Sequence, residues 1–414
     1  MSAAPKASTL ASSPVSPAAS PPPQTALAVV VTGGLAYGLY FGAFGAWSPY
    51  FPVYFTGLGA SLAVIGVLSA IPALVQIVAA PAWGLLADRL GDVRPLLLAG
   101  AIVAGASALL LAGSPPIALL FVGVTVFALG TAGMPAMIDA HVVVRLGSAR
   151  DRFGQARAIG SIGFIAVSII TGWIVAASGA RSLFLIFVPL MVLTGVAAIT
   201  LFGRPVTRER VGGIGPMGAI RLLNNRSLAL FFLGACVTWT AASGGLTYFS
   251  LRLVEQGADA GLIGIAWAVN ALIEVPMMLL FRRLTRRFGV RALIVGGAVA
   301  FGLRSAGWAL AGSAVASVLA SSVGGVGVAL FLVGTTAWVA DRTPPALRAT
   351  AQALFVGTTY AVGAIVGALV AGFIASGWGL STMFACSAAT GFTGAAIVWL
   401  AVGRPVLWGR TAAG

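Results

Sequence analysis

Between two long apolar runs lies the charged stretch Gly84-Leu85-Leu86-Ala87-Asp88-Arg89-Leu90-Gly91-Asp92-Val93-Arg94-Pro95. Its charges are unusual in a chain in which only 8% of the residues are charged and 59% are hydrophobic. Such a loop is expected at a membrane boundary, because basic side chains hold a loop on the cytoplasmic side and glycine lets the chain reverse. The stretch therefore predicts a short cytoplasmic loop that joins two membrane helices.

The composition of the whole chain agrees with a membrane protein. A mean hydropathy of +1.03 excludes a soluble globular domain, and 55 glycines suit closely packed membrane helices. The net charge is +15, but the basic residues lie between the apolar runs. They therefore mark the orientation of membrane helices and do not indicate a nucleic-acid partner. Cys236 and Cys386 lie far apart inside apolar segments, so we expect neither a disulfide framework nor a metal site, and no cofactor.

The apolar runs predict an all-α membrane protein with twelve transmembrane helices, each near the ~20 residues needed to cross a bilayer. The predicted spans are 27–55, 61–83, 95–113, 117–145, 155–178, 181–203, 228–253, 260–281, 292–312, 315–340, 346–376 and 380–403. The same pattern divides the chain into a disordered N-terminal tail, a first six-helix bundle, a linker loop, a second six-helix bundle and a C-terminal tail. Their predicted bounds are 1–25, 26–203, 204–227, 228–404 and 405–414.

The basic residues predict the orientation of these helices. If the N-terminus is cytoplasmic, nearly all of the 24 lysine and arginine residues fall on the cytoplasmic side, and the outer side keeps Arg181 and Arg252. Positive charge collects on the cytoplasmic side of membrane proteins. We therefore expect a multi-pass protein of the cell (inner) membrane with both termini in the cytoplasm.

A second, weaker copy of the charged stretch begins at Arg282 and ends at Arg291. Shifting the numbering by about 198 superimposes Gly91 on Gly289 and Gly66 on Gly264, and places Gln76 on Glu274. An internal repeat of half the chain is expected of a transporter built from two related halves.

The first charged stretch resembles the pattern Gly-x-Leu-x-Asp-Arg-x-Gly-x-(Arg/Lys) that joins the second and third helices in the major facilitator superfamily. That resemblance implies that the two stretches are broken and remade at a cytoplasmic gate during transport. The expected gate residues are Gly84, Asp88, Arg89, Gly91, Arg94, Arg286, Arg287 and Gly289.

A longer segment resembles one subgroup of that superfamily. The stretch from Phe153 to Phe164 and the preceding Asp139 are similar to the lactose-permease and phenylpropionate-permease-like transporters. The resemblance implies that Arg157 and Asp139 form a substrate-contacting pair and that Phe164 stacks on the substrate. Trp47-Ser48-Pro49-Tyr50-Phe51-Pro52 and the stretch 341–352 resemble the same group. The acid and histidine that handle protons on the tenth helix of lactose permeases are replaced here by Val326 and Ala329, which makes lactose a doubtful substrate.

Charged residues inside predicted spans are the strongest functional signal, because a charge in a membrane span costs several kcal/mol unless it is paired or faces a cavity. Asp139, Arg157, Glu274 and Arg304 are such residues. Counting along the helices places Glu274 and Arg304 within roughly 8 Å of each other in depth, so a pair is possible. A proton-carrying carboxylate and an anion-holding arginine are one interpretation, and a structural ion pair is the other.

Several neutral residues join these charges as candidates. Trp267 and Asn270 precede Glu274 by seven and four positions and share its helix face. Gln76 is the repeat partner of Glu274. Tyr37 and Tyr40 belong to an aromatic stripe on the first helix, for which packing against neighbouring helices is favoured over contact with substrate.

Together these patterns predict a secondary active transporter, functional as a monomer, that moves a small organic solute by alternating access, with proton symport through Glu274 and Asp139. An aromatic or other organic acid is slightly favoured over a sugar or nucleoside, because guanidinium groups bind carboxylates bidentately. A proton-driven exporter and a transporter-like sensor remain alternatives. We find no catalytic motif, so an enzyme is not expected.

Overall fold

The structure, a computed structural model, describes residues 25–203, 222 and 224–403. The predicted tails, apart from residue 25, and most of the predicted linker lie outside these described residues. Within them the chain is helical and contains no strand. The long helices are α1 Ala26–Trp47, α3 Leu62–Leu90, α4 Arg94–Ala112, α5 Ile117–Thr131, α6 Met134–Leu146, α7 Phe153–Ser178, α8 Leu183–Leu201, α10 Arg226–Glu255, α11 Ala260–Leu310, α12 Ala314–Arg342 and α14 Val362–Val402. Two shorter ones are α2 Phe51–Gly57 and α13 Arg348–Phe355.

Nine helical segments of the described residues are long and apolar enough to cross a membrane. Three of them, Ile117–Ser178, Ala260–Leu310 and Thr350–Val402, exceed fifty residues. Each is interrupted inside: the first by a 3-10 turn at Gly147–Arg152, the others by non-helical backbone at Gly289 and Gly379. Every interruption falls between two consecutive predicted spans. The all-helical membrane fold is thus confirmed, while the count of twelve spans stays a prediction.

Helix boundaries follow the local sequence, and the internal repeat reappears in them. The Ser61 side chain accepts a hydrogen bond from the backbone at the start of α3, and Asp259 does the same for α11. Both residues are good N-caps because their oxygens accept from otherwise unpaired backbone N–H groups. Gly91 ends α3 in the left-handed conformation with φ 66°, as expected where the chain reverses.

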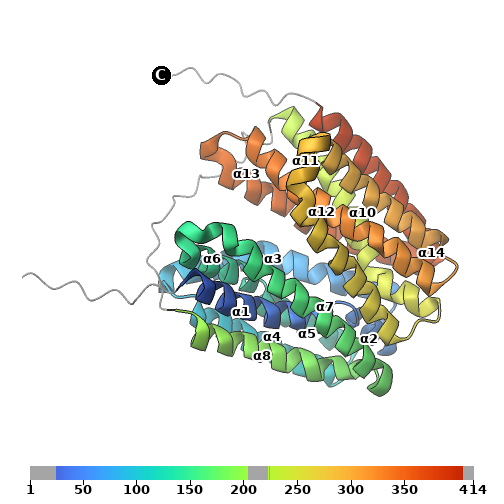
Figure 1. Cartoon of the computed structure of the whole chain (residues 1–414). Helices are drawn as coiled ribbons and strands as arrows, with labels where there is room; N and C mark the ends of the chain where they lie inside the picture. Colours follow the sequence, from blue (N-terminus) through green and yellow to red (C-terminus); the bar gives the residue numbers. More distant parts are fainter. Residues whose placement is uncertain (1–24, 204–221, 223, 404–414) are drawn as a thin grey trace, which may run out of the picture.

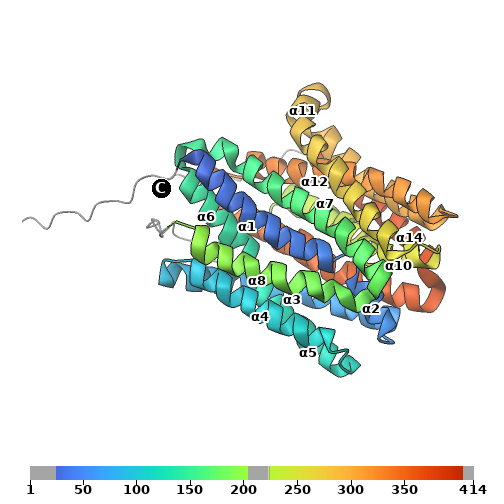
Figure 2. The same cartoon turned by 60° about the horizontal axis from the view of Figure 1, so that its bottom comes forward.

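The helices form two bundles, which we call the first bundle (α1–α8) and the second bundle (α10–α14). Figure 1 shows that the bundles meet at the end where α2 lies and spread apart towards α6 and α13. Figure 2 shows the same grouping from a second side, with one end of α11 standing away from the first bundle. We call these two ends of the molecule the joined end and the divergent end.

At the joined end two seams of glycine hold the bundles together. In one seam, a Cβ added to Gly264 of α11 would stand 2.4 Å from the carbonyl oxygen of Ser168 on α7. In the other, a Cβ on Gly66 of α3 would stand 2.5 Å from the carbonyl oxygen of Ala368 on α14. Contacts this short are open only to glycine, so the two seams bring backbone against backbone.

A tyrosine closes each seam. The Tyr50 hydroxyl donates to the Ser168 carbonyl at 2.6 Å and lies 3.4 Å from the Ala260 carbonyl of the second bundle. The Tyr248 hydroxyl crosses in the other direction and donates to the Leu62 carbonyl at 2.8 Å. Tyr50 and Tyr248 are 198 residues apart, so equivalent tyrosines of the two halves make these hydrogen bonds at the joined end.

Candidate functional site

The predicted gate residues lie at the divergent end and do not touch across it. Asp88, Arg89, Arg286 and Arg287 are exposed, and none has a hydrogen-bonding or ion-pair partner among the described residues. No atom of another helix among the described residues lies within 4 Å of a Cβ built on Gly84, so no neighbouring helix packs on this glycine in this conformation. The two stretches are therefore separated here, and their role as a gate stays a prediction.

The rest of the first charged stretch is held internally. Arg94 pairs with Asp92, with 2.7 Å between Nη2 and Oδ2. The hydrogen bonds from Arg94 lower the pKa of the Asp92 carboxyl. Gly91 and Gly289 both adopt positive φ, at 66° and 78°, so both members of this repeated pair terminate a helical segment. In this conformation Arg94 stabilises its own loop and does not reach the second bundle.

The expected pair in the first bundle forms. Arg157 Nη1 of α7 lies 3.1 Å from Asp139 Oδ1 of α6. The Tyr37 hydroxyl of α1 donates a short hydrogen bond to the same oxygen. The Arg157 guanidinium also lies over the rings of Phe41 and Tyr37, 4.7 and 5.3 Å from their centroids. Both charged side chains keep more than two-fifths of their surface exposed, so the pair is accessible from the divergent end.

The pair considered for the second bundle does not form. Glu274 has no hydrogen-bond or ion-pair partner among the described residues. Arg304 is 1% exposed and donates from Nη2 to the Ala242 carbonyl at 2.7 Å. Its guanidinium lies between the rings of Trp308 and Phe301, at 4.5 and 5.2 Å from their centroids. Glu274 and Arg304 are therefore not bonded to each other, although counting along their helices places them at similar depth in the membrane.

The helices α7 and α11 run antiparallel and set the position of Glu274. Ser168 lies opposite Gly264 at the joined end, and the rings of Phe164 and Trp267 lie 6.4 Å apart further along. Arg157 precedes Phe164 by seven residues, and Glu274 follows Trp267 by seven, so the two charges occupy corresponding levels of the facing helices.

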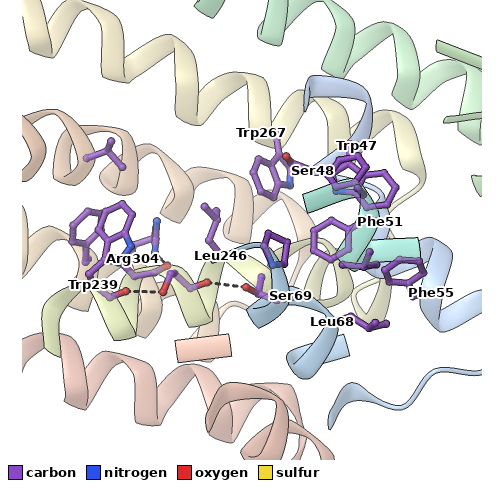
Figure 3. Close-up of a pocket in the computed structure, with 18 residues that line it drawn as sticks. Trp47, Ser48, Phe51, Phe55, Leu68, Ser69, Trp239, Leu246, Trp267 and Arg304 are labelled. Atoms are coloured by element: carbon purple, nitrogen blue, oxygen red, sulfur yellow. Dashed lines mark hydrogen bonds between the residues drawn. The ribbon is translucent and has the colours of Figure 1, made fainter. Parts of the chain in front are cut away.

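A cavity of about 310 Å³ lies between the bundles, on the joined-end side of these charges. Figure 3 shows Trp47, Phe51 and Phe55 at one side of it and Trp239 and Arg304 at the other. Its walls are mainly aromatic and apolar, with a few hydroxyl groups, as is usual for sites that bind small organic molecules. The remaining lining residues are Ser48, Leu68, Ser69, Pro72, Val124, Phe127, Ala242, Ser243, Leu246, Thr247, Trp267, Phe301 and Val328.

Only two of the residues expected at the substrate site, Trp267 and Arg304, line this cavity. The other expected residues do not line it: Asp139, Arg157, Phe164, Asn270, Glu274, Gln76, Tyr37 and Tyr40. Of these, Gln76 is exposed, and Tyr40 is buried against the rings of Phe41 and Phe44. Tyr40 therefore packs in the first bundle, as the favoured interpretation of the aromatic stripe expects.

Sequence reasoning missed one face of α10. Trp239, Ser243 and Thr247 follow one another at intervals of four and all line the cavity. Ser243 and Thr247 each donate to the carbonyl four residues earlier, at 2.8 and 3.0 Å, which leaves their lone pairs free to accept. In the sequence, the two hydroxyl residues follow the tryptophan at intervals of four, and this helical spacing could have identified the face.

The comparisons with known proteins agree with this architecture. The family model described as "MFS_1 like family" matches residues 34–386, which is most of the chain. The chain belongs to this family of the major facilitator superfamily. It is thus a multi-pass membrane transporter and not an enzyme, and the superfamily resemblance seen in the sequence is confirmed.

Relatives and solved structures support the same assignment. Maltose permease of Geobacillus stearothermophilus is 28% identical over 362 residues, covering 84% of this chain and 89% of the relative. Sugar efflux transporter A of Dickeya chrysanthemi is 26% identical over 357 residues, covering 81% and 86%. A crystal structure of the nucleoside transporter NupG superimposes with a TM-score of 0.78 at 19% identity, covering 92% and 99%.

Proposed function

We propose that this major facilitator protein is a proton-coupled symporter of a small organic solute, functional as a monomer. Two six-helix halves, 26–203 and 228–404, would rock about the solute and expose it to each side in turn. Both termini and the linker would be cytoplasmic, as the distribution of basic residues favours. The divergent end then faces the cytoplasm, and the conformation described here is open to the inside.

The observation that carries the proposal is the placement of one arginine between two acids. Arg157 is bound to Asp139 in its own bundle, while Glu274 stands at the corresponding level of the facing helix. Closure of the divergent end would bring Glu274 towards the guanidinium. A single guanidinium compensates one carboxylate, and an uncompensated carboxylate in a dry interior takes up a proton. Closure would therefore be tied to protonation of one acid.

The chemistry of the cavity bears on the class of solute. An aromatic or other organic acid is favoured because Arg304 lines the aromatic cavity without an acidic partner among the described residues. A sugar is the second candidate. The maltose permease and the sugar efflux transporter favour it, and aromatic walls with hydroxyl acceptors also suit a polyol.

The test is uptake by the purified protein in proteoliposomes, with internal pH recorded while aromatic acids, sugars and nucleosides are added in turn. Protein-free vesicles control for weak acids that cross lipid unaided. Glu274→Gln should abolish uphill uptake while counterflow exchange continues. The matched control is Glu255→Gln, because Glu255 is an exposed acid paired with Arg252 at the joined end. Uphill uptake at the wild-type level in Glu274→Gln would remove this acid from the coupling step, and exchange of none of the solutes would favour a sensor.

A further inference from the structure

Two arginines in the second bundle, Arg252 and Arg304, are buried, and they differ in their counter-ions and hydrogen-bond partners. Arg252 is 8% exposed and bonds to the Glu255 carboxylate at 2.6 Å and to the carbonyls of Trp308 and Ala311 at 3.2 Å. Its charge and its N–H groups are satisfied, as expected of a structural arginine. Arg304 is buried more deeply, has no acidic partner among the described residues, and has an N–H group without an acceptor.

The charge of Arg304 has no counter-ion among the described residues. The ion pairs there join Arg94 to Asp92, Arg157 to Asp139 and Arg252 to Glu255. Arg304 makes one hydrogen bond, to the Ala242 carbonyl, and its buried Nε has no acceptor. A buried charge left in this condition destabilises the empty protein, and an anion in the adjoining cavity would remove that cost.

A second unsatisfied group lies beside the first. Asn270 Oδ1 is buried without a hydrogen-bond partner. A Cβ added to Gly324 would stand 3.0 Å from Asn270 Oδ1 and 3.1 Å from Arg304 Nη1, so the amide and the guanidinium meet at this glycine. An amide can present either its oxygen or its two N–H donors to a ligand. Glycine at this position leaves room for the Arg304 side chain, and the amide lies beside the guanidinium that lines the cavity.

The rest of the cavity specifies what accompanies the anionic group. Trp239 supplies a flat apolar surface beside Arg304, and Trp267 supplies a second one nearer to Ser48 (Figure 3). The hydroxyls of Ser69, Ser243 and Thr247 are already donating to carbonyls of their own helices, so they can only accept from a ligand. A ligand suited to these walls has a planar apolar body with hydroxyl donors.

We infer that the solute is a hydroxylated monocarboxylate with a planar body, and that Arg304, with Asn270, binds its carboxylate. This inference rests on the proposed transport function. It separates the tasks of two arginines: Arg157 is compensated by Asp139 and serves coupling, whereas Arg304 lines the cavity and binds the solute. A monoanion carried with one proton transfers no net charge, so uptake would not respond to the membrane potential.

The test compares two probes that differ only at the carboxylate. Binding of 4-hydroxybenzoate and of 4-hydroxybenzamide to the purified full-length protein is followed by calorimetry and by quenching of tryptophan fluorescence. The wild-type protein should prefer the acid by about 10- to 100-fold, the range for a hydrogen-bonded charge. Arg304→Gln should bring the two affinities together, and Arg304→Lys should keep part of the preference. Arg181→Gln is the control and should keep the whole preference, because Arg181 is exposed and does not line the cavity.

Equal affinities in the wild-type protein, or a preference that survives Arg304→Gln, would overturn the inference. Thermal unfolding of Arg304→Lys and Arg304→Gln establishes that both variants are folded. The two proposals also fail separately. If maltose is taken up with protons while the acid neither binds nor moves, the transport function stands and this inference is wrong. If the acid binds through Arg304 without counterflow, the inference stands and the transport function is wrong.

Discussion

Replacing Gly66 and Gly264 with alanine tests whether the two seams hold the molecule in this conformation. The three atoms nearest to a Cβ built on either glycine all belong to the opposite bundle. The added methyl groups would stand 2.5 Å from the Ala368 carbonyl oxygen and 2.4 Å from the Ser168 carbonyl oxygen, and real Cβ contacts are essentially never shorter than 3.0 Å. Because backbone cannot turn aside as a side chain can, the seams must separate.

The size of the effect follows from the cost of overpacking, which is about 1–3 kcal/mol at each site. The two seams are separate, so the double variant should disfavour the joined end by roughly 2–6 kcal/mol. Since 1.36 kcal/mol corresponds to a tenfold change, the population should shift by about 30-fold or more towards molecules open at this end. The gain in helix propensity from glycine to alanine is the same in both conformations and cancels.

The assay is the distance between spin labels at Ser148 and Phe288, two exposed positions on different bundles at the divergent end. Labelling requires replacement of Cys236 and Cys386 by serine. The double alanine variant should populate a shorter distance, because closing the divergent end accompanies opening of the joined end. Gly377→Ala is the matched control, since open space surrounds that glycine. Identical distance distributions in the double variant and wild type would refute the reasoning.

Three further predictions concern single residues. Tyr248→Phe removes a hydrogen bond across the seam and should shift the same distances by about fivefold in population, or ~1 kcal/mol, whereas Tyr54→Phe removes a bond within the first bundle and should leave them unchanged. Gly324→Ala would place a methyl 2.4 Å from Arg304 Cδ, so solute binding measured by calorimetry should weaken by about 1–3 kcal/mol; unaltered affinity would mean that Arg304 has room to move. Asp88→Asn should slow turnover in proteoliposomes with little change in binding, and wild-type turnover would leave the charged stretch a structural loop.

The sequence was sufficient for the fold because membrane helices depend on local composition. Apolar runs of bilayer length, the basic loops and the repeat of 198 residues each require only linear patterns. The repeat also aligns Gly66 with Gly264, the two glycines of the seams. The role of these two glycines could not be predicted from that alignment, because only the packed structure shows that each lies against a carbonyl of the opposite bundle.

The candidate site was predicted less completely. Asp139 and Arg157 were found because a charge inside a membrane span needs a partner and the resemblance supplied one. The sequence left open whether Glu274 and Arg304 form a pair, since depth along a helix fixes height and not direction, and the two are not bonded in the structure. Arg304 turns towards Ala242 and two aromatic rings, whereas Glu274 lies on α11 at the level that corresponds to Arg157 of α7. Rotation about the helix axis depends on contacts with neighbouring helices, which linear spacing does not encode.

The antiparallel pairing of α7 with α11 has a mechanical consequence. If the contact between Phe164 and Trp267 acts as a fulcrum, the short arm to Gly264 is three residues, or about 4.5 Å, and the long arm to Glu274 is seven, or about 10.5 Å. Parting the seam by one ångström would then move the acid by roughly twice that distance towards Arg157. The size of the side chain at position 164 would set this ratio. It would therefore also set how far the joined end must open before Glu274 reaches Arg157.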